Sequence, residues 1–330
     1  MQPFEPDWRP SASLELLQLR ATLLARVRAF FSQHAVLEVD TPVLSRAAST
    51  DPALLSFQTR YHGPGAAAGA TLYLHTSPEF PMKRLLAAGS GSIYQVCKVF
   101  RDGEYGACHN PEFTLLEWYR TGFDHLDLMD DVEQLLRAVL DGILPPVSVH
   151  HWSYRDLFLE FAGLDPFKVT ATELMNLLEG RHSVVTVGMQ DAALDDWLDL
   201  AMTHVIEPRL GSGLAFVRDY PASQAALARI RPGNPPLASR FEVYLNGVEL
   251  ANGFHELADA QEQRRRFAAD AARREQSGLP AVAMDERLLD GLAAGLPDCA
   301  GVALGLDRLL MIACGAECLA EVLAFSFEVS

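Results

Sequence analysis

The strongest constraint on the fold of this 330-residue chain lies at residues 241–254, which read Phe-Glu-Val-Tyr-Leu-Asn-Gly-Val-Glu-Leu-Ala-Asn-Gly-Phe. Polar and apolar side chains alternate in both halves of this segment, and Asn246-Gly247 separates them. Alternation with a period of two is typical of a strand, and Asn-Gly between two such runs is the strongest local signal for a tight hairpin. The chain therefore contains an antiparallel strand pair, which excludes a purely helical fold.

Other strand-like runs lie before and after this hairpin. Residues 92–101 and 112–120 are two of these strand-like runs, and a polar loop containing Gly103 separates them. We expect these runs to form a second antiparallel pair with a long loop. Residues 299–305 read as a glycine-rich strand that runs into an apolar helix from Asp307.

Apolar residues at helical spacing predict helices at residues 14–31 and 128–139, and residues 258–277 read as a polar helix. Ser13 precedes the first helix as a candidate N-cap, and Gly278 follows the last as a candidate C-terminal stop.

Two segments complete the expected organisation. Residues 37–44 predict a short strand in which Pro42 favours an edge or an interface, because proline cannot donate to a ladder. Residues 150–215 read as mainly helical and carry no recognisable motif. Since the strands pair by hairpins and the helices lie between groups of strands, the predicted class is α+β, with a central antiparallel sheet flanked by helices.

The charge balance limits the classes of function. The chain has 43 acidic and 27 basic side chains, a formal net charge of −16, which disfavours broad nucleic-acid binding but leaves room for a local basic patch. The N-terminus lacks a secretory pattern, and charged residues interrupt the most apolar stretch, so we expect no membrane span and a cytoplasmic location. Five cysteines without a Cys-x-x-Cys pair predict reduced thiols.

Charged residues on the predicted sheet are candidates for chemistry. Arg101 ends a strand, where its guanidinium could hold a phosphate while an aromatic side chain of the same sheet stacks on a base. Glu249 and Glu256 lie on or after the hairpin, and two neighbouring carboxylates suit Mg²⁺ bound to phosphates. Each feature alone also fits a solvated surface side chain. Because the sequence has neither a P-loop nor a Rossmann glycine motif, an ATP site would have to be built on the sheet.

Two more segments carry candidate binding residues. Gly301 and Gly305 flank Ala303 on the last predicted strand, where glycine often marks the close approach of a ligand, and Arg308 opens the helix that follows. The turn Ser77-Pro78-Glu79 places a carboxylate at a loop edge, where it could bind an ammonium group.

Together these segments resemble the three signature motifs of class II aminoacyl-tRNA synthetases, in order and over nearly the whole chain. The motifs are the helix and strand that end at Pro42, then Val99-Phe-Arg101 with His109-Asn-Pro-Glu-Phe113 and Glu117-Trp-Tyr119, and finally Gly301-Val-Ala-Leu-Gly-Leu-Asp-Arg308. Thr76-Ser-Pro-Glu79 and Glu249-Leu-Ala-Asn-Gly-Phe-His-Glu256 are most similar to the lysyl-tRNA synthetase branch.

The resemblance implies one catalytic domain over residues 1–330, with 150–215 as a helical insertion and no N-terminal anticodon-binding domain. Within the branch, the chain is similar to truncated paralogues that ligate (R)-β-lysine to a lysine of elongation factor P. Ala303 stands where the synthetases usually have glycine, and an added methyl group can discriminate between substrate isomers by about 1–3 kcal/mol. The same resemblance implies a homodimer that acts on elongation factor P rather than on tRNA.

The resemblance also implies a role for each motif residue, with ATP as a substrate and Mg²⁺ as the metal. The implied catalytic residues are Arg101, which would hold the α-phosphate, Arg308 and Glu249. The implied amino-acid pocket consists of Ser77, Pro78, Glu79, Tyr119, Glu256 and Ala303. The implied ATP-binding residues are Arg101, Asp102, Gly103, His109, Asn110, Phe113, Glu249, Leu250, Gly305 and Arg308, with Phe113 and Arg308 on the two faces of adenine. Glu249 and Glu256 are the implied metal ligands.

One departure and two alternatives stay open. Many relatives have an acidic residue where this chain has Gly103, which Glu104 follows, so either nearby carboxylate could lie beside the adenylate. The chain could instead activate an amino acid for tRNA or another acceptor, or it could be an inactive module that binds an amino acid and regulates another process. Retention of both arginines and both glutamates of the motifs favours a catalyst.

Overall fold

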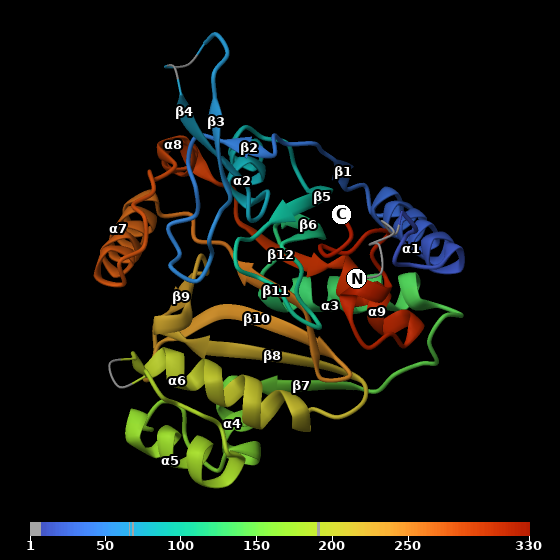
Figure 1. Cartoon of the computed structure of the whole chain (residues 1–330). Helices are drawn as coiled ribbons and strands as arrows, with labels where there is room; N and C mark the ends of the chain where they lie inside the picture. The colour runs from blue at the N-terminus through green and yellow to red at the C-terminus, as the bar shows by residue number, and fades with distance from the viewer. Residues whose placement is uncertain (1–7, 66, 68, 190–191) are drawn as a thin grey trace, which may run out of the picture.

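The computed structural model describes residues 8–65, 67, 69–189 and 192–330. One long sheet runs through the middle of this part of the chain, and helices pack around it (Figure 1). Its strand order is β1-β5-β6-β12-β11-β10-β8-β7, with β9 paired to β10. The strands are β1 (Leu37–Glu38), β5 (Ile93–Phe100), β6 (Glu112–Thr121), β7 (Val149–Ser153), β8 (Leu214–Pro221), β9 (Ile230–Arg231), β10 (Leu237–Leu245), β11 (Val248–His255) and β12 (Cys299–Gly305).

A second, small sheet has the order β2-β4-β3. It consists of β2 (Leu44–Ser45), β3 (Gln58–Tyr61) and β4 (Ala70–Leu74).

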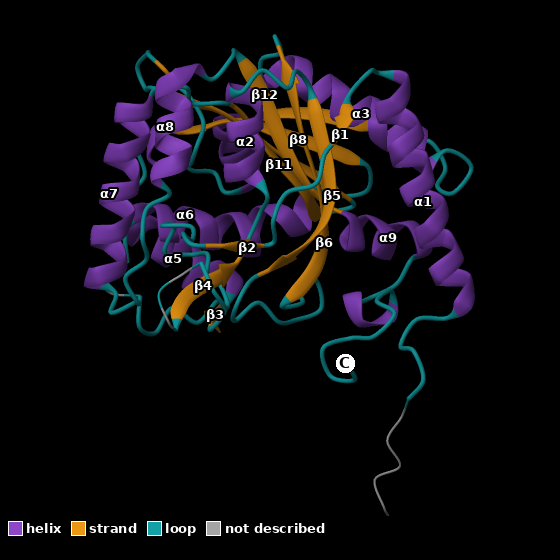
Figure 2. Cartoon of the chain, turned by 90° about the horizontal axis from the view of Figure 1, so that it is seen from above, coloured by secondary structure: helices purple, strands orange, loops and turns teal. Residues whose placement is uncertain are grey.

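Helices cover both sides of the long sheet (Figure 2). On one side, α1 (Leu14–Gln33), α3 (His125–Leu140) and α9 (Leu306–Cys314) supply the largest apolar core together with the central strands. On the other side lie α2 (Glu79–Ala87), α7 (Ala260–Gln276) and α8 (Glu286–Gly295), which share a smaller core. None of the helices in the described ranges combines the length and apolarity that crossing a bilayer requires.

The segment between β7 and β8 has an apolar core of its own. It contains α4 (Tyr154–Phe161), α5 (Ala171–His182) and α6 (Leu194–Ala201), followed by a π-helical turn over Met202–Ile206. This segment lies at the β7 end of the sheet, away from α1 and α9 (Figure 1).

The predictions that depend on residues close together in the sequence are confirmed. The Ser13 hydroxyl accepts a hydrogen bond from the Leu16 amide and caps α1. Asn246 and Gly247 join β10 to β11 with φ angles of 53° and 77°, the left-handed values that a tight hairpin turn requires. The long-looped pair of β5 and β6 and the glycine-rich β12 also form as predicted.

The single strand predicted at residues 37–44 is wrong. The segment divides into β1, which pairs parallel to β5 in the long sheet, and β2, which pairs with β4 in the small sheet. Pro42 lies between them, where no ladder bond is needed from its nitrogen. The long sheet is also parallel at both ends, at β1/β5 and β7/β8, whereas the central run from β5 to β8 is antiparallel as predicted.

Candidate functional site

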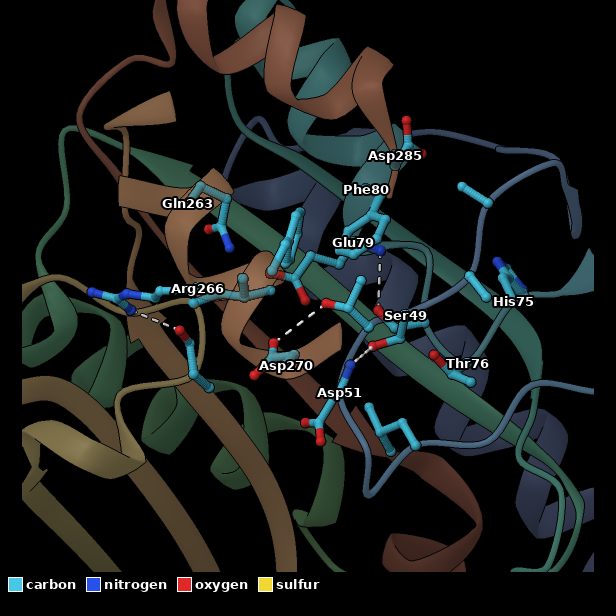
Figure 3. Close-up of a pocket in the computed structure, with 18 of the residues that line it drawn as sticks. Ser49, Asp51, His75, Thr76, Glu79, Phe80, Gln263, Arg266, Asp270 and Asp285 are labelled. Carbon is cyan, nitrogen blue, oxygen red and sulfur yellow. Dashed lines mark hydrogen bonds between the residues drawn. The ribbon is translucent and has the colours of Figure 1, made fainter. Parts of the chain in front are cut away.

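A cavity of about 930 Å³ opens on the antiparallel centre of the long sheet. Its walls come from β6, β11 and β12, from α2, α7 and α8, and from the loop that follows β2. Figure 3 shows side chains of α2 and α7 around this cavity, among them Glu79, Phe80, Gln263, Arg266 and Asp270. Because residues from distant parts of the chain converge here on rigid strands, the cavity is the principal candidate for a binding site.

One end of the cavity contains a buried carboxylate, Glu117 of β6. The Ser77 hydroxyl donates to its Oε2 over 2.6 Å, and the Tyr119 hydroxyl donates to its Oε1 over 2.7 Å. Burial raises the pKa of Glu117 to about 7, and the nearby charge of Glu79 adds to this effect. The two predicted pocket residues Ser77 and Tyr119 therefore orient a third acidic residue that the sequence reading had not assigned to the site.

A buried ion pair network adjoins this carboxylate. The Lys83 ammonium lies 2.6 Å from Glu79 Oε1 and 2.5 Å from Glu256 Oε2. Burial by itself would lower the pKa of Lys83, but the two carboxylates, chiefly Glu256, outweigh burial and raise it. Both predicted acidic residues of the amino-acid pocket thus lie together, held by a lysine that was not predicted to take part.

The strand β12 forms the floor beside these carboxylates, and its small residues leave the space open. A Cβ on Gly301 would lie 2.2 Å from Tyr119 Cε1 and 2.6 Å from Glu256 Oε1, so no side chain fits there. Ala303 is the register partner of Glu117 on β6 and of Asn252 on β11. The predicted specificity residue therefore lies between two polar residues of the cavity wall.

A second group of motif residues lies around Arg101, just beyond the end of β5. The Arg101 guanidinium is 5.0 Å from the centre of the Phe113 ring, and its Nε donates to the Thr76 carbonyl over 3.4 Å. Of the two acidic side chains that follow Arg101, Glu104 makes the ion pair, at 3.3 Å. Gly103 adopts a φ of 84°, a left-handed value that favours glycine.

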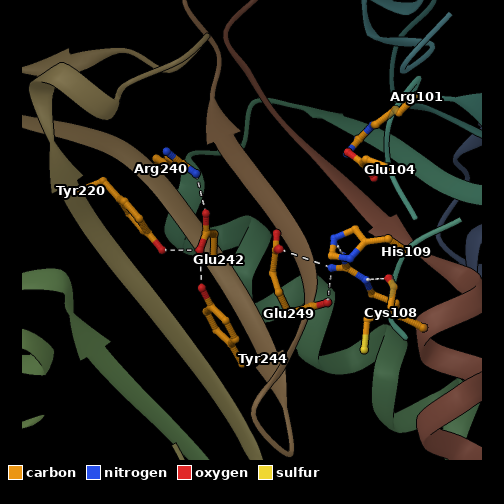
Figure 4. A network of polar contacts seen from close by, with 10 residues as sticks. Arg101, Glu104, Cys108, His109, Tyr220, Arg240, Glu242, Tyr244 and Glu249 are labelled. Atoms are coloured by element: carbon orange, nitrogen blue, oxygen red, sulfur yellow. Dashed lines mark hydrogen bonds and ion pairs between the residues drawn. The ribbon is translucent and has the colours of Figure 1, made fainter. Parts of the chain in front are cut away.

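Arg308 lies at the start of α9 and binds three segments at once. Its Nε donates to the Cys108 carbonyl over 3.0 Å, and its Nη1 donates to the Glu249 carbonyl over 2.9 Å and to Glu249 Oε2 over 3.3 Å. Its Nη2 donates to His109 Nε2 over 2.9 Å. Burial and the Arg308 charge lower the pKa of His109, which keeps the imidazole neutral. Arg308, Glu249 and His109 thus form a polar cluster. Figure 4 shows Glu249 and His109 on the side of the site where Arg101 lies.

A neighbouring network on β10 supports both groups. Glu242 Oε2 accepts hydrogen bonds from the hydroxyls of Tyr220 (2.6 Å) and Tyr244 (2.5 Å), and Oε1 accepts one from Arg240 over 2.5 Å. Arg240 Nε also donates to Asn252 Oδ1 over 3.2 Å, which leaves the Asn252 amide nitrogen as a donor in the cavity wall. Figure 4 shows Glu242 and Glu249 on adjacent strands.

Other predicted residues have supporting positions. The Asn110 amide donates to the Glu112 carbonyl over 2.6 Å and so stabilises the loop before β6. Pro78 is the N-cap residue of α2, and Leu250 is buried in the main core. The Asp102 amide donates to the Leu55 carbonyl, and Gly305 is the N-cap residue of α9. Their contacts with a nucleotide stay predictions.

The expectation that Glu249 and Glu256 share one metal ion is wrong. The two residues are seven positions apart along β11, and a strand rises ~3.3 Å per residue, which separates them by roughly 20 Å. Glu256 is also 1% exposed and paired with Lys83, whereas the Glu249 side chain is 39% exposed. Within the described ranges, no group of three or more His, Cys, Asp or Glu residues could hold a metal ion alone. Glu249 still fits an ion carried mainly by phosphates, because such an ion needs only one or two protein carboxylates.

The sequence reading missed Lys83, Glu117, Asn252 and the Arg240–Glu242 pair. Lys83, Glu117 and Glu242 are buried polar residues, at positions that normally hold a hydrophobic side chain. A charged residue inside an apolar run was visible in the sequence at Glu117, within Leu-Leu-Glu-Trp-Tyr. Its partners could not be predicted, because the partner of each buried charge comes from a distant segment.

Comparisons with known proteins identify the family of this chain. A family model described as tRNA synthetases class II (D, K and N) matches residues 6–328. A protein of Vibrio cholerae is 50% identical over 327 residues, covering 97% of this chain and 98% of that protein. Relatives in Vibrio vulnificus (48% over 327 residues, 99% and 100% covered) and Salmonella typhi (48% over 322 residues, 97% and 98% covered) are similarly close. All three are named elongation factor P–(R)-β-lysine ligase.

Proposed function

This chain belongs to the class II tRNA synthetase family (D, K and N), and we propose that it is an ATP-dependent ligase that joins (R)-β-lysine to a lysine of elongation factor P. The observation that carries the proposal is the buried acidic pocket at Glu79, Glu117 and Glu256, next to Ala303 rather than glycine. Relatives that carry this activity in their names match the chain over nearly its full length.

The pocket suits an amino acid with two ammonium groups and a carboxylate. The three carboxylates that line the cavity can bind ammonium groups by charge-assisted hydrogen bonds, which are the stronger kind. The free amide nitrogen of Asn252 lies in the same wall and can donate to the substrate carboxylate. Ala303, between Asn252 and Glu117, restricts the path of the carbon chain between those groups.

Activation requires little covalent chemistry from the protein. The substrate carboxylate oxygen attacks the α-phosphorus of ATP, the bond to the bridging oxygen breaks, and pyrophosphate leaves. Arg101 and Arg308 would neutralise the charge that accumulates on the phosphates, and Phe113 would stack on adenine. The distance of 5.0 Å between the Arg101 guanidinium and the Phe113 ring supports a single site for base and phosphate.

The metal would lie on the nucleotide side of the site. Glu249 has a partly exposed carboxylate beside Arg308 and is the residue we propose to hold Mg²⁺ together with ATP phosphates. When bound, Mg²⁺ neutralises phosphate charge. We leave Glu256 out of the metal site and assign it to the amino-acid pocket, because Lys83 already pairs with it.

In the second step the ε-amine nitrogen of the acceptor lysine attacks the carbonyl carbon of the adenylate. An amide bond forms, AMP leaves, and the amine loses one proton to solvent or to a base. Holding the two reactants close together in the correct orientation supplies most of the rate enhancement in such a transfer.

We also propose a cytoplasmic homodimer that acts on elongation factor P in preference to tRNA. The exposed apolar side chains of Leu14, Leu37 and Leu44, on or next to the first motif, support an interface there. A monomer by sedimentation at micromolar concentration would contradict the dimer.

ATP–pyrophosphate exchange tests the activation step. We expect (R)-β-lysine to support exchange better than (S)-β-lysine or α-lysine. Arg308→Ala should lower kcat/KM by about 100- to 1,000-fold, the range for loss of a charge-stabilising group. A preference for α-lysine would favour an enzyme that charges tRNA or another acceptor, and no exchange with any amino acid would favour an inactive regulatory module.

A further inference from the structure

Lys83 of α2 is buried to an unusual degree for a lysine. Its side chain is 1% exposed, and lysine is almost never fully buried unless it is paired. The ammonium contacts Glu79 Oε1, one turn earlier on the same helix, and Glu256 Oε2, at the end of β11. Lys83 therefore connects a helix to the sheet at the edge of the cavity.

The two carboxylates line the cavity, whereas Lys83 is not among its lining residues and lies behind them. Each carboxylate uses one oxygen for Lys83, and no donor of the described chain pairs with Glu79 Oε2 or Glu256 Oε1. Glu256 Oε1 lies near Gly301 on the cavity floor, 2.6 Å from the position that a Cβ would take. One oxygen of each acidic residue is thus bound by the protein and one is left over.

The net charge of the pocket also indicates a ligand with two ammonium groups. Three carboxylates at Glu79, Glu117 and Glu256 with one lysine give a net charge of minus two once all are ionised. Two ammonium groups of a ligand would neutralise that charge. A lysine that served only the fold would need one carboxylate partner, and neither partner would have to line the cavity.

We propose that Lys83 is a positioning residue of the amino-acid pocket, which binds one oxygen of Glu79 and one of Glu256 and thereby sets the pocket to bind two ammonium groups. The inference rests on the proposed function only where it identifies the natural ligand as a diamino acid. The pocket therefore binds diammonium ligands more tightly than monoammonium ligands, and this preference depends on Lys83.

Calorimetry without ATP tests the statement, with 1,4-diaminobutane and butylamine as probes. We expect the native protein to bind the diamine at least about tenfold more tightly than the monoamine. In Lys83→Met the ratio should fall to about threefold or less, and Lys83→Arg, which keeps the charge, should restore part of it. Lys98→Met removes the same group from an exposed pair with Glu112 and should leave the ratio unchanged.

Kinetics supply a second readout that a purely structural role would not move. We expect Lys83→Met to raise the KM for (R)-β-lysine at least tenfold in pyrophosphate exchange while the KM for ATP stays the same. If Lys83→Met does not fold, Lys83→Gln replaces it, because the amide can donate a hydrogen bond but carries no charge.

The results of these experiments distinguish the role of Lys83 from the proposed ligase function. Unchanged diamine preference and unchanged KM in a folded Lys83 variant would overturn the inference, and so would a native protein that binds both amines equally. Diamine preference that is lost with Lys83, in a native protein that does not activate β-lysine, would support the inference and reject the proposed function.

Discussion

Ala303 on β12 is the direct register partner of Glu117 on β6. This pairing places the one small side chain that differs from the usual synthetase glycine against a carboxylate that Ser77 and Tyr119 hold in place. A methyl group at this point takes up space next to the carboxylate that we propose to bind a substrate ammonium. If the proposed function holds, the choice of amino-acid isomer depends on the sheet itself, where a strand fixes the position of the methyl group.

Ala303→Gly should relax the preference for β-lysine. Removing one methyl group from a fitted pocket changes discrimination by about 10- to 200-fold, so the ratio of kcat/KM for (R)-β-lysine over α-lysine should fall within that range. Pyrophosphate exchange with both amino acids measures the ratio. Ala300→Gly, on the same strand but the opposite face, serves as control and should leave it unchanged. An unaltered ratio in Ala303→Gly would show that Ala303 does not determine the preference for β-lysine.

Gly301→Ala should disable the amino-acid pocket. The new Cβ would overlap the Tyr119 ring and Glu256 Oε1, so both side chains must move, at a cost of about 1–3 kcal/mol in the free energy of unfolding. We expect the KM for (R)-β-lysine to rise more than tenfold and the KM for ATP to stay the same. Gly291→Ala in α8 meets its nearest atom at 3.4 Å, an ordinary contact, and is the matched control. Normal β-lysine affinity in Gly301→Ala would show that the floor of the pocket lies elsewhere.

Binding of β-lysine should weaken as the pH falls through about 7. Burial raises the pKa of Glu117 to about 7 from its ordinary value of 4.5, so the carboxylate that attracts an ammonium group is protonated below that pH. Glu117→Gln should raise the KM at pH 8 and weaken this inflection in the profile of kcat/KM against pH, which retains a contribution from Glu256, because burial raises the pKa of that carboxyl to about 8.

The stability of the protein should change in the opposite direction. Because the folded carboxyl of Glu117 takes up a proton more readily than the unfolded one, its contribution to stability is present below pH 4.5 and is lost as the pH rises towards 7. Urea unfolding of native protein and Glu117→Gln at several pH values measures this difference. Parallel stability profiles for the two proteins would contradict the buried position of the carboxyl.

Asp307 should be the most sensitive polar position for stability near the third motif. Its carboxylate is 1% exposed, pairs with Arg20 of α1 and accepts the Thr114 amide of β6 over 2.6 Å. Removing one partner of a buried pair costs about 3–5 kcal/mol, so Asp307→Ala should lower the urea midpoint strongly, and Asp307→Asn, which keeps an acceptor, should lower it less. A loss below about 1 kcal/mol in Asp307→Ala would mean that the pair is not buried in solution.

The sequence predicted those parts of the fold that depend on neighbouring residues. Asn246-Gly247 determines a hairpin through its own backbone preferences, and Ser13 caps α1 through a bond three residues away. The division of residues 37–44 between two sheets depends on where β5 and β4 lie, which no local pattern contains.

The site could be predicted only in part, for the same reason. The motif residues Arg101, Glu249 and Arg308 were candidates from their chemistry and place on the predicted strands, resemblance supplied their roles, and the structure brings the last two together. Whether Glu256 faces a metal or Lys83 depends on a contact between β11 and α2, which are far apart in the sequence. Buried charges acquire their roles from such distant partners, so sequence alone leaves them undecided.

The most direct test of the account is transfer of the activated amino acid to its acceptor. Purified protein, ATP, Mg²⁺ and labelled (R)-β-lysine are incubated with elongation factor P and tRNA-Lys together, and mass spectrometry and acid-precipitable label measure modification of each. The account predicts that the label appears on one lysine of elongation factor P, requires ATP, and is absent from tRNA. Label on tRNA alone, or on neither acceptor while exchange proceeds, would contradict it.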